Sequence, residues 1–131
     1  MRFHDFIGKV QNLADLPGEQ DALKTTRVTL ETLAERLAGN EPNNIAAQLP
    51  EEIGRFLTTE QTEGESFSLE DFYRRVAEKT GADETDARHQ ARAVMAVVNE
   101  AITSGEMRDI RSQLPNEFNS LLYPPENESN R

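Results

Sequence analysis

The stretch FSLEDFYRRV, residues 67–76, carries the clearest helix start in the sequence. Ser68 can accept a hydrogen bond from the backbone of the first turn, and Asp71 stands three residues later, where the acidic partner of a capping box is found. Phe67 and Phe72 flank this start at the spacing of a hydrophobic staple. The stretch therefore predicts a helix that begins directly after Ser68.

Outward from this start, apolar residues recur at three- and four-residue spacing along nearly the whole chain, a pattern typical of amphipathic helices. Breaks between the stripes contain glycine and proline, as at 39–42, where Asn40 can cap a new helix and Pro42 suits its first turn. We therefore expect an all-α protein. The first two stripes consist of Phe3, Phe6, Ile7, Val10, Leu13 and Ala14, and of Leu23, Thr26, Leu30, Leu33, Ala34 and Leu37.

The pattern of the first half of the chain returns in the second half. Asp5-Phe6 aligns with Asp71-Phe72 at an offset of 66 residues. After the first loop the offset becomes 65, and Gln48-Leu49-Pro50 aligns with Gln113-Leu114-Pro115. The apolar positions of the long helices stay in step as well. We therefore predict two tandem copies of a roughly four-helix unit that form a pseudo-two-fold helical bundle.

The predicted boundaries follow from composition. Residues 1–60 form the first helical repeat and residues 67–123 the second, while 61–66 are polar and predict a linker. Residues 124–131 predict a disordered tail. A unit of this length buries proportionally little surface and is marginally stable alone, so we expect the two copies to pack together.

Each short third helix ends in a repeated motif, Ala47-Gln48-Leu49-Pro50 in the first copy and Ser112-Gln113-Leu114-Pro115 in the second. We expect the leucines to be buried, the prolines to open the fourth helix and the glutamines to brace the turn between the helices. The alternative is a paired recognition surface in which the leucines are exposed to a partner.

The two copies with this motif resemble a bacterial family known as domain of unknown function 2267. The resemblance covers roughly residues 3–123, and the second copy departs from the motif at Ser112. It implies a bacterial, all-helical domain of two repeats. It implies no catalytic residues, because the family has no established activity.

The charge and composition of the chain exclude several functional classes. The net charge is −10, from 24 acidic and 14 basic residues, and both halves are acidic. A protein that binds the nucleic-acid backbone needs an excess of lysine and arginine, so we expect no nucleic-acid partner. There is no cysteine, which excludes disulfides and thiolate chemistry. No apolar stretch approaches the roughly 20 residues that span a bilayer, so we expect a cytoplasmic protein without a membrane partner.

No constellation of residues identifies an enzyme. Asp86 and His89 have the i, i+3 spacing of half a carboxylate–histidine metal site. Helical geometry places His89 away from the apolar stripe, however, and His4 is also expected on the surface. The acidic residues gather at helix starts, where the helix dipole accounts for them. We therefore predict no catalytic residue, no metal site and no cofactor.

Four arginines in the second half are candidate binding residues. Arg74 and Arg75 on one helix, and Arg88 and Arg92 on the next, could converge on a small anion or an acidic partner. The interpretation that we favour is instead a surface of intrahelical ion pairs, because acids stand within about a turn of these arginines.

Arg27 is the fifth candidate, because Arg27 and Glu35 recur in the second copy as Arg92 and Glu100. We interpret this recurrence as inter-helix ion pairs that fix the packing of each repeat. The alternative is a pseudo-symmetric binding site where the copies meet.

These patterns favour a non-enzymatic helical interaction or regulatory module, with a protein partner or a second copy of the chain as its target. One alternative is a small-ligand or anion-binding module at the junction of the two repeats. Another is an enzyme whose site the sequence does not reveal.

Overall fold

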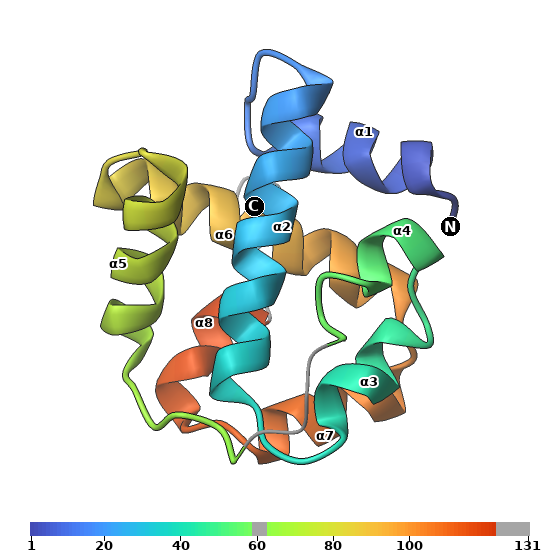
Figure 1. Cartoon of the computed structure of the whole chain (residues 1–131), viewed down its shortest axis with the longest axis vertical. Coiled ribbons are helices and arrows are strands. Elements are labelled where there is room, and N and C mark those ends of the chain that lie inside the picture. Colours follow the sequence, from blue (N-terminus) through green and yellow to red (C-terminus); the bar gives the residue numbers. More distant parts are fainter. Residues whose placement is uncertain (59–62, 123–131) are drawn as a thin grey trace, which may run out of the picture.

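The computed structural model describes residues 1–58 and 63–122, and these residues form eight α-helices and no β-strand (Figure 1). The all-α prediction is therefore confirmed for the described residues. Positions 59–62 and 123–131 lie outside them, and so do part of the predicted linker and the whole predicted tail. The helices are α1 (Phe3–Leu13), α2 (Glu19–Arg36), α3 (Glu41–Ala46), α4 (Glu51–Gly54), α5 (Leu69–Thr80), α6 (Glu84–Ala101), α7 (Ser104–Ser112) and α8 (Asn119–Leu122), with a 3-10 turn at Asn116–Phe118.

The start of α5 has the local structure that its sequence predicts. Ser68 is the N-cap, and its hydroxyl oxygen accepts a hydrogen bond from the Asp71 amide at 3.1 Å. The rings of Phe67 and Phe72 lie 6.5 Å apart across this cap, as a hydrophobic staple requires. The Asp71 carboxylate is engaged by Arg74 in the same turn. The cap and the staple are therefore confirmed.

The two long helices, α2 and α6, cross at the centre of the molecule (Figure 1). Both α1 and α5 pack against each of these helices, and α8 packs against α6. The short helices α3 and α4 lie together, and α3 also contacts α7, which is more than fifty residues further along the chain. Segments from before and after the predicted linker are thus interleaved.

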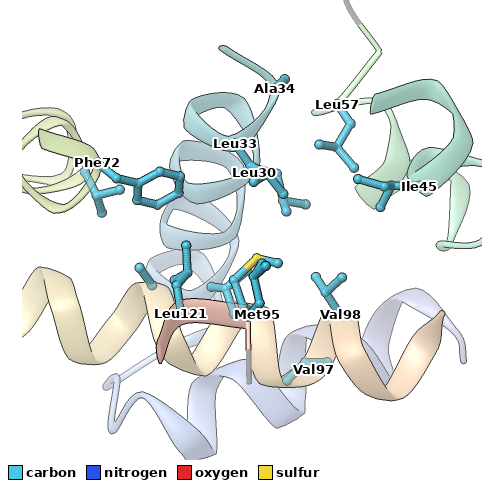
Figure 2. Packing of buried hydrophobic residues seen from close by; sticks show 14 of the residues in the cluster. Leu30, Leu33, Ala34, Ile45, Leu57, Phe72, Met95, Val97, Val98 and Leu121 are labelled. Carbon is cyan, nitrogen blue, oxygen red and sulfur yellow. The ribbon is translucent and has the colours of Figure 1, made fainter. Parts of the chain in front are cut away.

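One cluster of buried apolar side chains fills the space between these helices. In Figure 2, Leu30 and Leu33 of α2 face Met95 of α6, and Phe72 enters the same space from α5. Ile45 and Leu57 close the opposite side. The core is therefore shared between the part of the chain before residue 59 and the part after residue 62.

The two leucines of the repeated motif are buried, with 8% of Leu49 and 7% of Leu114 exposed. The alternative in which these leucines are exposed to a partner is therefore wrong. Pro50 is the N-cap of α4, and Pro115 is the N-cap of the 3-10 turn, so each proline precedes a helical segment as predicted.

The two glutamines of the motif act at longer range than predicted. Gln48 Oε1 accepts a hydrogen bond from the Thr103 amide at 2.8 Å, and Gln113 Oε1 accepts one from the Ala38 amide at 3.2 Å. Each glutamine thereby connects its own loop to the residue that follows the end of a long helix in the other half of the chain. The sequence does not predict these long-range bonds because they depend on the tertiary contact between α3 and α7, which brings each loop beside the distant helix end.

None of the described helices is both long and apolar enough to cross a membrane.

Candidate functional site

Three of the five candidate arginines are neutralised by carboxylates. Arg27 Nη1 lies 3.4 Å from Glu31 within α2. Arg74 pairs with Asp71 and, at 3.8 Å, with Glu84. Arg74 therefore follows the interpretation of the second-half arginines as a surface of local ion pairs, whereas Arg27 pairs within its own helix and not across helices as interpreted from its recurrence.

Arg75 is held more firmly and by more distant residues. Its Nη1 lies 2.9 Å from Glu35 of α2 and 3.0 Å from Glu65, and its guanidinium group stands 3.8 Å from the centre of the Phe67 ring. The hydrogen bond that Arg75 donates to Glu65, with a further one that it donates to Glu35, raises the pKa of Arg75, and the contact with Arg75 lowers the pKa of Glu65. Arg75 therefore fastens α5 to α2 rather than meeting Arg88 and Arg92.

Glu35 and Glu100 both form inter-helix ion pairs. Glu35 contacts Lys79 of α5 at 3.1 Å in addition to Arg75, and Glu100 of α6 contacts Lys9 of α1 at 3.1 Å. The glutamates therefore behave as interpreted from their recurrence. The arginines that recur beside them in the sequence take no part, because Arg27 pairs within its own helix.

Arg88 and Arg92 both line one pocket. The pocket measures about 280 Å³, lies beside α5 and α6, and is lined by Leu69, Glu70, Tyr73, Arg88, Arg92, Glu117 and Ser120. The Arg88 guanidinium stands 5.3 Å from the centre of the Tyr73 ring. No carboxylate among the described residues forms an ion pair with either arginine.

The polar groups around this pocket are mostly hydrogen-bond donors. Burial raises the pKa of the Tyr73 hydroxyl, against the opposing effects of Arg92, a hydrogen bond with Ser120, and Arg88. The hydroxyl is therefore neutral near pH 7 and able to donate. The Glu117 carboxylate binds the backbone instead of an arginine, because its Oε2 accepts a hydrogen bond from the Leu69 amide at 3.3 Å. The arrangement suits an anionic group better than a cationic one.

The two histidines lie away from this pocket. The His89 side chain is 55% exposed, as predicted, and its Nε2 lies 3.4 Å from Asp15. His4 is also exposed and pairs with Glu19 at 3.2 Å. Neither lines the pocket, so the described residues offer no histidine base beside the arginines.

A second polar site lies where α3 meets α7, and sequence reasoning missed it. One carboxylate oxygen from each of Glu41, Glu106 and Asp109 lies within 4.8 Å of the other two. Only 7% of Glu41 is exposed, and Oε2 of both Glu41 and Glu106 is buried without a hydrogen-bond partner among the described residues. Within the part of the chain that the structure describes, these three residues form the group that could hold a metal ion.

The electrostatics of this cluster are unfavourable for three ionised groups. Burial raises the pKa of Glu41 to about 8, with further contributions from the adjacent carboxyl group of Glu106 and from the charge of Asp109. Carboxylates this close repel one another, so a proton on one of them is favoured, and Glu41, the most buried of the three, tends to hold it. The sequence signal for this pair was the recurrence of glutamate at positions 41 and 106, 65 residues apart.

Comparison with known proteins identifies a family for the chain but gives no activity. No curated protein matches it. A family model described as "Uncharacterized conserved protein (DUF2267)" matches residues 3–121. The match spans all eight helices nearly to the end of α8, including both repeated motifs and both polar sites. The chain therefore belongs to the DUF2267 family.

Proposed function

We propose that this chain is a non-enzymatic binding module whose ligand is a small anion, held at the pocket of Arg88 and Arg92. The observation that carries the proposal is the pairing state of the arginines. Although the chain has 24 acids against 14 bases, the two arginines at the pocket form no ion pair with a carboxylate of residues 1–58 or 63–122, whereas Arg27, Arg74 and Arg75 all do. Like charges at i, i+4 repel by a few tenths of a kcal/mol, and a bound anion would relieve this repulsion.

The dimensions and donors of the pocket favour a carboxylate or phosphate group. Guanidinium groups donate two parallel hydrogen bonds to such groups, and the hydroxyls of Tyr73 and Ser120 line the same pocket. A volume of about 280 Å³ is at the small end of ligand pockets, which suits a compact group. The negative charges of Glu70 and Glu117 at the same place disfavour a polyanion such as nucleic acid.

A protein partner, expected from the sequence, has less support than a small anion. Among the described residues, the large hydrophobic side chains that are substantially exposed are Met1 and Leu13, at 48% and 47%. Docking surfaces are typically contiguous apolar patches of several side chains. We therefore rank the anion first.

We also propose that the two halves are tandem copies related by a pseudo-two-fold axis. Support comes from contacts that occur twice, between residues that correspond at an offset of 65 or 66. The contact of Gln48 with Thr103 corresponds to that of Gln113 with Ala38. The ion pair of Glu35 with Arg75 corresponds to that of Glu100 with Lys9.

The anion site can be tested by titrating the full chain with inorganic phosphate and with acetate, followed by amide chemical shifts. We expect saturable binding with a dissociation constant on the order of 1 mM, which corresponds to about 4 kcal/mol. The double variant Arg88→Gln, Arg92→Gln should weaken this binding at least tenfold. The matched control is Arg55→Gln, which removes a similar exposed charge outside the pocket. Shifts that do not saturate, or an equal loss in the control, would contradict the proposal.

A further inference from the structure

We propose that Glu41, Glu106 and Asp109 form a binding site for a hard divalent cation, best fitted by Ca²⁺, that links α3 to α7. The proposal does not depend on the anion pocket. That pocket is lined from α5, α6 and the segment Glu117–Ser120, whereas the three carboxylates come from α3 and α7.

The spacing of the carboxylate oxygens is compatible with a calcium ion. The three oxygens lie within 4.8 Å of one another. Ca²⁺ takes oxygen ligands at roughly 2.3–2.6 Å, so two ligands on opposite sides of one ion stand up to about 5 Å apart. Mg²⁺ binds at roughly 2.0–2.1 Å and needs the oxygens within about 4.2 Å. Calcium therefore fits at every separation up to 4.8 Å, whereas magnesium fits only if the oxygens lie closer than about 4.2 Å. Oxygen ligands alone suit neither zinc nor copper.

Two buried oxygens of the cluster are available to a cation. Oε2 of Glu41 and Oε2 of Glu106 have no hydrogen-bond partner among the described residues, and Glu41 is more than nine-tenths buried. Burying a carboxylate without a compensating charge or hydrogen bond is costly. Glu41 and Glu106 belong to the first turns of two different helices, α3 and α7. The dipole of each helix favours an acid at its own start, but it does not explain why the two carboxyl groups lie close together. A cation among them would satisfy both free oxygens together.

Neighbouring groups hold Glu106 in place without occupying the side that faces the cluster. Gln48 Nε2 donates to Glu106 Oε1 at 3.3 Å, which leaves Oε2 free. The Glu106 amide donates to the hydroxyl of Thr103, the N-cap of α7, at 3.1 Å. Gln48 is in turn fixed by the Thr103 amide. Gln48 is therefore a positioning residue for the cluster.

The exposure of the third carboxylate gives the site an open side. Glu41 is buried and Glu106 half-buried, but Asp109 is exposed. Calcium takes six to eight oxygen ligands and completes its shell with water where the protein supplies fewer. A cation can therefore enter past Asp109 and keep several waters there. Because α3 precedes the linker and α7 follows it, the bound cation would join both parts of the chain.

The test uses the full chain freed of metal by a chelator and then titrated with CaCl₂ or MgCl₂. Calorimetry should show one saturable calcium site, with a dissociation constant of roughly 10⁻⁴–10⁻³ M because the protein supplies only three ligands. The thermal midpoint should rise with calcium concentration, since the cation binds the folded chain. Magnesium should bind at least tenfold more weakly. A chain whose midpoint rises on acidification but is unchanged by calcium would overturn the proposal, since protons alone would then occupy the cluster.

Two variants locate the site. Asp109→Asn changes an exposed side chain, so the fold is retained, and calcium affinity should fall at least tenfold. Glu41→Gln should abolish measurable calcium binding. The matched control is Glu52→Gln, an exposed acid on α4, which should bind calcium as the wild type does. Unchanged affinity in Asp109→Asn, or equal weakening in Glu52→Gln, would place any calcium elsewhere and overturn the proposal.

Discussion

Glu41 is the residue whose environment differs most from what its sequence position suggests. It stands in the first turn of a short helix, where an acidic residue is ordinarily solvated. Here Glu41 is buried and lies close to the carboxylates of Glu106 and Asp109. Its pKa is therefore raised well above that of an ordinary glutamate, and it keeps its proton at neutral pH. The protonation state of this one side chain therefore affects the stability of the whole chain.

Stability in metal-free buffer should depend on pH through Glu41. Its pKa is raised from 4.5 to about 8, so the stability that the protonated form provides is fully present below the lower value. That stability is lost as the pH rises through about 8, because the unfolded chain has already released the proton. Each pKa unit corresponds to about 1.4 kcal/mol, so the total loss is at most a few kcal/mol.

The variant Glu41→Gln should remove most of this dependence, because glutamine stays neutral at every pH. Thermal midpoints measured by circular dichroism across this range should fall with pH for the wild type and remain nearly level for the variant. Above about pH 8 the variant should be the more stable of the two. Glu52→Gln is the control and should keep the wild-type slope. A slope that is equal in Glu41→Gln and in the wild type would show that Glu41 does not hold the proton.

At the scale of elements, the connections between the α3–α4 loop and α7 determine how the two parts of the chain meet. Gln48 contacts Thr103 and Glu106, and Gln113 contacts Ala38. The bonds to Thr103 and Ala38 satisfy the backbone amides directly after the C-caps of α6 and α2, which are Ile102 and Leu37. The same residue type at corresponding places thus secures both long helices at their ends.

Removing the Gln48 side chain should loosen the end of α6. Gln48→Ala leaves the Thr103 amide without its partner, so this amide should exchange its hydrogen faster, and the free energy of unfolding should fall by about 1 kcal/mol. Native-state hydrogen exchange and urea unfolding measure the two effects. Gln20→Ala, at an exposed position of α2, is the control and should change neither. Unaltered protection of Thr103 in Gln48→Ala would argue against this role.

At the scale of the whole molecule, the shared core makes the two parts of the chain interdependent. Leu30 and Leu33 of α2 belong to the same buried cluster as Phe72 and Met95, which follow the predicted linker. The ion pair between Arg75 and Glu35 connects the same two parts. A fragment that lacks α5 and α6 would leave the apolar face of α2 uncovered.

A chain that ends at Gly64 should therefore fail to fold cooperatively. Its apolar core residues would lose the cover of α5, α6 and α7, and a unit of this length is marginal even when its core is complete. Circular dichroism should show a broad or absent thermal transition, whereas the full chain should give a sharp one. A fragment as stable as the full chain would mean that the halves are independent domains.

The amino-acid sequence alone determined the helical class, the cap at Ser68, the staple of Phe67 and Phe72, and the burial of Leu49 and Leu114. These features depend on residues a few positions apart, or on which face of a helix is apolar. Helical periodicity specifies both.

Only the tertiary structure decided which arginines are paired and where the carboxylates meet. Arg75 finds Glu35 forty positions away, and Glu41 meets Glu106 across two helices. An ion pair or a ligand cluster requires atoms to be placed within about 4 Å, which depends on helix crossing and side-chain rotamers. The periodicity of a sequence leaves both unspecified, which is why the arginines were identified as candidates together while the carboxylate cluster went unrecognised.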